Sequence, residues 1–216
     1  FAAEEIRRAL LDVKAKGIPI VISMGNVAAS GGYWVSMVGD TIFADPATIT
    51  GSIGVFSVFP TFEKALPRIG ITADGVATTP LSGQPDLLRG TNETTDALMQ
   101  AGVEDIYRRF TNMVAEKRKM PLDKVLEVAQ GRVWAGGAAR QIGLVDRFGS
   151  LDDAIAEAAR LAKVEADDVN RVWIEPGQGL LSGLLGDFMG TRAQAPSADI
   201  FTRLAWQQQA LAFSAL

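Results

Sequence analysis

One serine, set among small residues and glycines, has the surroundings that covalent catalysis needs. Ser30 follows two alanines and precedes Gly31 and Gly32, between an apolar run at 18–24 and a second apolar stretch. This order is typical of a nucleophile elbow, a sharp strand-to-helix turn that exposes the hydroxyl. The N–H of Gly31 would then stabilise developing negative charge at a helix N-terminus. The alternative is a helix N-cap, in which the Ser30 hydroxyl bonds the first turn.

The composition limits which group could activate such a serine. The 216 residues include no histidine and no cysteine, which excludes a Ser-His-Asp triad, a thiol nucleophile and metal sites built from these ligands. A desolvated lysine with a lowered pKa can act as the base instead. The chain has seven lysines, all predicted on helices or their ends with polar neighbours, where a solvated position is expected: Lys14, Lys16, Lys64, Lys117, Lys119, Lys124 and Lys163.

Charge and hydropathy exclude several other classes of function. The net charge of −4 and the pI near 5.0 provide no basic surface for nucleic acid. Residues 17–39 are uncharged and long enough to span a bilayer, but their proline and glycines favour a buried strand, a turn and a helix. Acidic pairs at 4–5 and 152–153 begin predicted helices, where the helix dipole favours them, so neither a metal nor a cofactor is expected.

Periodicity predicts an α/β fold. An amphipathic helix over 3–14 precedes the apolar run at 18–24, which is typical of a strand buried on both faces. Trp34, Trp134 and Trp173 are expected in the core. Further strands are expected at 41–44, 51–59, 71–77 and 132–134, helices at 33–38, 60–69, 94–119, 121–130, 138–141, 151–162 and 199–216, and a loop at 78–92.

Four sequence blocks occur in a fixed order, at 24–34, 44–55, 131–134 and 143–146. Together they resemble the signal peptide peptidase A (protease IV) family of serine proteases. The resemblance implies a fold like those of the Clp protease and crotonase groups, with a buried, mostly parallel sheet flanked by helices. It extends to about residue 163, so we expect a peptidase domain over 1–163 and a C-terminal extension over 164–216.

The resemblance also implies a role for individual residues. Ser30 matches the nucleophile, Gly31 the oxyanion donor, and Ser52 a serine that orients the catalytic lysine. Without the family, Ser52 is equally well explained as a turn hydroxyl bonded to its own backbone. The glycine-dotted strand around Ser52 matches one wall of the substrate groove, formed by Gly51, Ile53 and Gly54.

Two departures from the family pattern suggest a divided active site. Residues 78–88 correspond to the segment that carries the lysine in short members, but they contain no lysine. A Ser-Pro-Gly-Gly block expected before the first helix is also missing. We therefore expect residues 1–216 to be the C-terminal half of the long tandem form, inactive alone, with the lysine base supplied from outside.

The function implied is a serine endopeptidase that degrades apolar peptides, such as cleaved signal peptides in the membrane. Expected partners are these peptides, further copies in a homo-oligomer, and the N-terminal half of the same protein. An anchor outside the sequence would hold it in the inner membrane, with its active face in the periplasm or outside. The alternatives are a crotonase-like acyl-CoA enzyme, which would not need Ser30, and a non-catalytic half that serves oligomer assembly.

Overall fold

The computed structural model describes residues 2–165 and 168–174. The chain divides into two units, Phe1–Val169 and Asn170–Leu216, and the first contains every described helix and strand. The amphipathic helix expected over 199–216 lies outside the described residues. The domain boundary expected after residue 163 stays a prediction. Within the described part, no helix is both long and apolar enough to cross a membrane.

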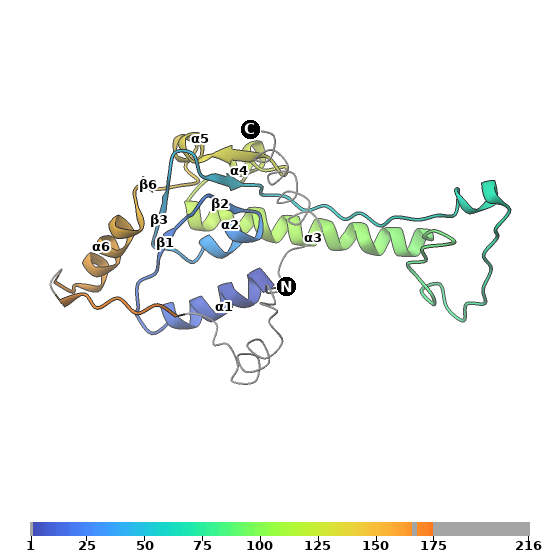
Figure 1. The fold of residues 1–216 in the computed structure, drawn as a ribbon, viewed down its shortest axis with the longest axis horizontal. Helices are drawn as coiled ribbons and strands as arrows, with labels where there is room; N and C mark the ends of the chain where they lie inside the picture. The colour runs from blue at the N-terminus through green and yellow to red at the C-terminus, as the bar shows by residue number, and fades with distance from the viewer. Residues whose placement is uncertain (1, 166–167, 175–216) are drawn as a thin grey trace, which may run out of the picture. The chain divides into compact units, whose positions relative to one another are not determined.

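The first unit mixes helices and strands along the chain (Figure 1). Its helices are α1 (Ala2–Lys14), α2 (Gly31–Ser36), α3 (Glu93–Arg118), α4 (Leu122–Val128), α5 (Gly136–Gln141) and α6 (Leu151–Ala162), with a 3-10 helix, η1 (Leu66–Ile69). Its strands are β1 (Val21–Ser23), β2 (Val27–Ala29), β3 (Thr41–Ala44), β4 (Ile49–Gly51), β5 (Val133–Ala135) and β6 (Arg147–Phe148).

Capping residues explain where two helices start. Asn92 precedes α3, and its side chain accepts a hydrogen bond from the Thr95 N–H at 2.8 Å. Ser150 and Asp153 form a reciprocal capping box at the start of α6. Both helices therefore begin where a polar side chain satisfies first-turn N–H groups that have no intrahelical acceptor.

The strands form two three-stranded sheets, and three of the four pairings are parallel. One sheet has the order β1-β3-β6, with both pairings parallel. The other has the order β2-β4-β5, in which β2 and β4 are parallel and β4 and β5 antiparallel. The predicted α/β class, with mostly parallel strands flanked by helices, is confirmed, although the strands are divided between two sheets.

The core lies where α2 and the C-terminal part of α3 meet the sheets. Every residue of β3 is buried, as expected for a strand covered on both faces. β1 is only partly buried, and Ile18 before it is 50% exposed, so the apolar run at 18–24 is less enclosed than predicted. Fully buried side chains include Tyr33, Met37, Ile42, Ile53, Val114 and Leu144.

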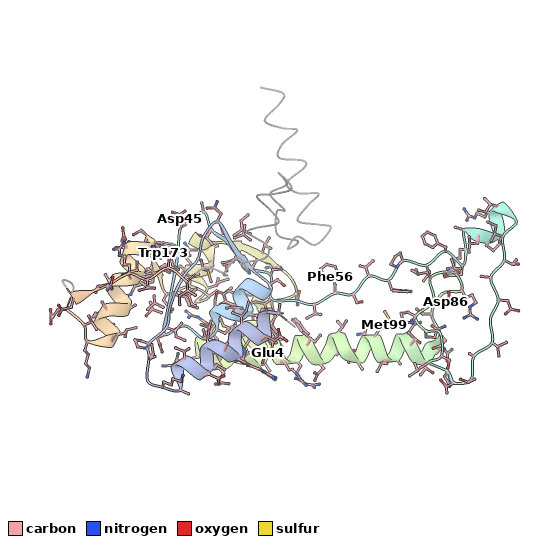
Figure 2. The ribbon with its side chains drawn as sticks, turned by 60° about the horizontal axis from the view of Figure 1, so that its bottom comes forward. Glu4, Asp45, Phe56, Asp86, Met99 and Trp173 are labelled. Carbon is pink, nitrogen blue, oxygen red and sulfur yellow. The ribbon has the colours of Figure 1, made fainter. Side chains whose placement is uncertain are left out.

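Two predicted strands are wrong. Apart from Gly51, which ends β4, the residues predicted as strands at 51–59 and 71–77 have no strand structure, because both belong to a segment that leaves the sheets (Figure 1). The part near Phe56 extends away from the sheets on the side to which α3 also projects, and Met99 lies on α3 (Figure 2). A strand needs a neighbouring backbone as its hydrogen-bonding partner. Apolar residues alone therefore did not make this segment a strand, and Phe56 is 79% exposed.

Other details also differ from the sequence analysis. The helix expected at 60–69 is only the 3-10 helix η1, Leu66–Ile69. β2 was not expected, because Val27–Ala29 is too short to show periodicity. Trp173 was expected in the core but is 71% exposed, and it belongs to the second unit. Trp34 and Trp134 are partly buried and pack against the core, as expected.

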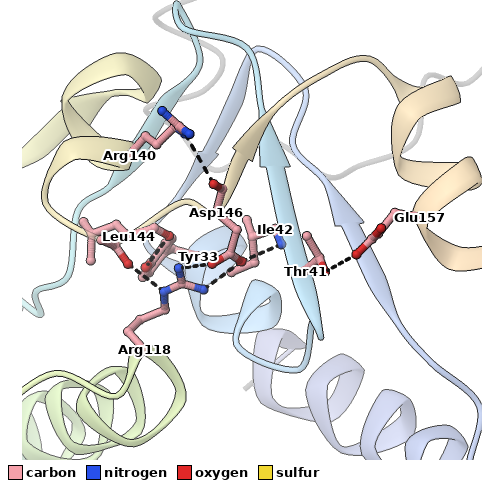
Figure 3. A network of polar contacts seen from close by, with 9 residues as sticks. Tyr33, Thr41, Ile42, Arg118, Arg140, Leu144, Asp146 and Glu157 are labelled. Atoms are coloured by element: carbon pink, nitrogen blue, oxygen red, sulfur yellow. Dashed lines mark hydrogen bonds and ion pairs between the residues drawn. The ribbon is translucent and has the colours of Figure 1, made fainter. Parts of the chain in front are cut away.

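A polar network joins α2, α3, β3 and the turn before β6 (Figure 3). The Arg118 guanidinium donates to both carboxylate oxygens of Asp146, at 2.6 and 3.1 Å, and to the carbonyl oxygen of Gly143 at 2.8 Å. The carboxylate of Asp146 also accepts the Ile42 N–H at 2.8 Å. The Tyr33 hydroxyl donates to the carbonyl oxygen of Leu144 at 2.9 Å, and burial raises the pKa of Tyr33, which keeps this donor protonated. The block at 143–146 is therefore a structural junction.

Replacing Asp146 with asparagine should lower the free energy of unfolding by about 2 kcal/mol, between the values for exposed and buried ion pairs. The amide keeps the shape but leaves the Arg118 charge, 11% exposed, without its counterion. Urea denaturation measures the loss. Glu127→Gln, which breaks an exposed pair with Lys124 on α4, is the control and should cost less than about 1 kcal/mol. Equal losses in the two variants would contradict the role of the junction.

Candidate active site

Ser30 occupies a sharp turn between β2 and α2. Its φ of 51° and ψ of −115° are rare for any residue except glycine. The residue is exposed, and its side chain makes no capping hydrogen bond to α2. The strand that enters the turn is β2, not the apolar run at 18–24. The local geometry is therefore that of a nucleophile elbow, and the capping hydrogen bond of the alternative reading is not formed.

Ser52 occupies the equivalent position after the neighbouring strand. The parallel register pairs Ala29 with Gly51, so Ser30 and Ser52 are the next residues along β2 and β4. The Ser30 N–H donates to the carbonyl oxygen of Gly51 at 2.9 Å, and the Ser52 N–H donates to that of Arg132 at 2.8 Å. Ser52 also has a φ of 51°. The structure thus brings the two serines together at the carboxyl ends of adjacent parallel strands.

Gly31 is the first residue of α2, where backbone N–H groups lack intrahelical acceptors. A Cβ added to Gly31 would lie 3.4 Å from the Cβ of Ala3, so the first turn of α1 contacts the first turn of α2. The Gly31 N–H lies at the N-terminus of α2, directly after Ser30. Backbone N–H groups at a helix N-terminus can stabilise negative charge, so this position is compatible with the predicted oxyanion donor.

The three residues predicted to form a groove wall lie beside β5 and the loop before it. Gly51 has a φ of 75°, and a Cβ there would lie 2.8 Å from the Trp134 ring. A Cβ on Gly54 would lie 2.5 Å from the backbone nitrogen of Gly131, whose N–H donates to the carbonyl oxygen of Ile53. The glycines therefore permit close approach of other parts of this chain. Ile53 is fully buried, backbone included, and its carbonyl oxygen already accepts the Gly131 N–H, so the structure does not expose it to a ligand.

No lysine forms a hydrogen bond to either serine within the described residues. The ammonium nitrogen of Lys14 lies 2.7 Å from the carboxylate of Asp40. Lys117 and Lys124 also have carboxylate partners on their own helices, at 3.5 and 2.9 Å. Hydrogen bonding to Glu127 raises the pKa of Lys124, the opposite of what a lysine base needs. Nor do the described residues place three or more acidic side chains together as a metal site.

A contact behind the turn was missed by sequence reasoning. Glu4 was interpreted only as an acidic residue at a helix start, and Trp34 only as a core residue. The Trp34 indole N–H donates to the Glu4 carboxylate at 2.8 Å. The two residues are separated by 30 positions, so no local spacing could have revealed the contact.

Comparison with known proteins gives a consistent result. Residues 12–165 match the sequence model of peptidase family S49. Protease 4 of Salmonella typhi is 41% identical over 198 residues, which cover 91% of this chain and 32% of that protein. The chloroplastic serine protease SPPA of Arabidopsis thaliana is 38% identical over 151 residues, 68% of this chain and 22% of that protein. The chain thus spans about a third or less of the length of these relatives.

Among the solved structures that align with the chain is a ClpP1 mutant from Listeria monocytogenes. It has a TM-score of 0.40 and 12% sequence identity, and the alignment covers 71% of this chain and 86% of that one.

Ser30→Gly should raise the free energy of unfolding by about 1 kcal/mol, although it removes the hydroxyl. The backbone strain at Ser30 costs serine about 1–3 kcal/mol, and glycine avoids it at a smaller cost in unfolded-state entropy. Urea denaturation measures the gain, and Ser30→Ala, which keeps the Cβ, should show none. As a control, Ser23→Gly in β1, where φ is not positive, should lose about 0.5–1 kcal/mol. Equal losses of unfolding free energy in Ser30→Gly and Ser23→Gly would contradict backbone strain at Ser30.

Proposed function

The chain belongs to peptidase family S49, and we propose that the protein is a serine endopeptidase with Ser30 as its nucleophile. The turn at Ser30 is the observation that carries this proposal. A strained, exposed serine with no capping bond stands between a strand and the first N–H groups of α2. A serine that served only as an N-cap would gain its stability from the capping bond that Ser30 lacks.

The geometry supports acyl transfer through a covalent intermediate. The Ser30 hydroxyl gives its proton to the base as its oxygen attacks the carbonyl carbon of the scissile peptide. The resulting oxyanion accepts a hydrogen bond from the Gly31 N–H. Collapse breaks the C–N bond, and the protonated base gives its proton to the leaving amine. Water, deprotonated by the same base, then hydrolyses the acyl-enzyme and restores Ser30.

The base is a lysine supplied from outside residues 1–216, and the Ser52 hydroxyl orients it. The sequence contains no histidine, and three of its lysines are paired with carboxylates. Ser52 supports this arrangement because the strand register places it beside Ser30. The N-terminal half of the same protein is the proposed source of the lysine.

The proposed substrates are apolar peptides in extended form, such as cleaved signal peptides. Residues 52–59 leave β4 without forming a strand, so a peptide can pair with them through its backbone. Gly51, Ile53 and Gly54 would form the wall nearest Ser30, and of these Gly54 is the one that is partly exposed. Phe56 and Val58 farther along are both exposed and provide apolar contacts.

The protein is also proposed to form a homo-oligomer anchored at the inner membrane, with its active face in the periplasm or outside. Exposed apolar side chains on the segment between β4 and α3, and on α3 itself, support self-association, because isolated soluble subunits rarely expose so many together. These side chains include Phe56, Val58, Phe62, Ile69, Ile71, Val76, Leu81, Leu87, Leu88, Leu98 and Ile106.

A fluorophosphonate probe should label the full-length protein, and Ser30→Ala should abolish the labelling. Ser52→Ala should slow labelling at least about tenfold, because a misoriented base loses part of the 10²–10⁴-fold effect of general-base catalysis. Ser23→Ala, at an exposed position of β1 outside the proposed site, is the control and should label normally. Labelling that survives Ser30→Ala would exclude Ser30 as nucleophile. A folded protein without labelling would favour the acyl-CoA enzyme or the non-catalytic half.

Residues 1–216 alone should hydrolyse an apolar peptide ester at least about 100-fold more slowly than when mixed with the rest of the protein, because the base is missing. Steady-state hydrolysis measures both rates. Introducing Ser30→Ala should remove the activity recovered in the mixture, which assigns that activity to this chain. Rapid hydrolysis by residues 1–216 alone would show that the base lies within them.

A further inference from the structure

A carboxylate on α1 contacts the helix that begins at Ser30. Glu4, labelled in Figure 2, accepts the Trp34 indole N–H at 2.8 Å. Arg7 and Arg8 donate to the same carboxylate at 2.7 and 2.8 Å. Hydrogen bonding from Arg7 lowers the pKa of Glu4 to about 2, against desolvation and with help from Trp34 and Arg8. The carboxylate is therefore ionised and held in one orientation toward α2.

The first turn of α1 contacts α2 at two points on one face. Gly31 and Trp34 are three residues apart, so they lie on the same side of the helix. Ala3 lies against Gly31, and Glu4 binds Trp34. The Trp34 ring also lies against that of Phe110 on α3, with ring centroids 4.8 Å apart. The indole is thus fixed by both α1 and α3.

α2 cannot hold its own orientation. It has six residues, begins with two glycines and has no side-chain cap. A helix this short is not stable by itself, so its direction depends on tertiary contacts. Of the side-chain hydrogen bonds in the described residues, those of Tyr33 and Trp34 link α2 to other elements, whereas that of Ser36 stays within the helix.

We propose that Glu4 is a positioning residue of the active site, which acts through Trp34 to hold the Gly31 N–H in the direction of the oxyanion. The inference rests on the proposed function, because it assigns a task to the same oxyanion donor. Glu4 forms no hydrogen bond to Ser30 in the structure. Its loss should therefore slow the attack by Ser30 without weakening the binding of a small probe.

The test uses the full-length protein and measures both the rate constant and the final extent of fluorophosphonate labelling. Glu4→Ala and Trp34→Phe should each lower the rate constant about tenfold, a fraction of the effect of removing an oxyanion donor entirely. The double variant should be no slower than either single variant, because both changes break one contact. Glu4→Gln, which keeps an oxygen acceptor for the indole, should restore most of the rate. Glu5→Ala, an exposed neighbour of equal charge, is the control.

The outcomes distinguish a positioning role of Glu4 from an effect of its substitution on folding. Full labelling at a reduced rate constant supports the inference. Reduced extent with an unchanged rate constant overturns it, because that pattern reports only a loss of folded protein. Equal rate constants for Glu4→Ala and Glu5→Ala overturn it as well, as do multiplicative effects in the double variant. If the unsubstituted protein is not labelled, the proposed function fails and the inference fails with it.

Discussion

The parallel pairing of β2 with β4 determines where the proposed catalytic groups lie. The pairing sets Ala29 opposite Gly51, so the two strands end together and each continues into a serine at positive φ. It depends on Gly51, because a Cβ there would collide with the Trp134 ring of β5. One glycine thus permits three strands to meet behind the two serines.

Strain at Ser30 is tolerated because the elements behind it are fixed by several independent contacts. Tyr33 is anchored to Leu144, and the adjacent turn is held by Arg118 and Asp146. These contacts are buried or partly buried, where hydrogen bonds and ion pairs are stronger than in water. Residues in rare backbone conformations persist only when their surroundings determine them this strongly. The block at 143–146 therefore supports α2, and no hydrogen bond in the described residues links it to Ser30.

The sequence predicted the elements whose own residues determine them. The acidic pair at the start of α6, the apolar residues of β3 and the small residues around Ser30 were all sufficient. β2 was missed because it becomes a strand only by pairing with residues about 20 positions later. The strands predicted at 52–59 and 71–77 were wrong because their apolar residues suggested strands, but no neighbouring strand pairs with them. Glu4 was missed because its contact with Trp34 depends on tertiary packing.

The segment between β4 and α3, together with α3 itself, connects Ser52 to the Arg118–Asp146 junction in the first unit. It starts at Ser52, beside Ser30, and returns through α3, a 26-residue helix that ends at Arg118. The outer end of the segment is therefore linked to the Arg118–Asp146 junction through one continuous helix, and to Ser52 through extended chain. A partner bound at the outer end would therefore have a continuous chain connection both to the junction behind α2 and to the strand end that carries Ser52.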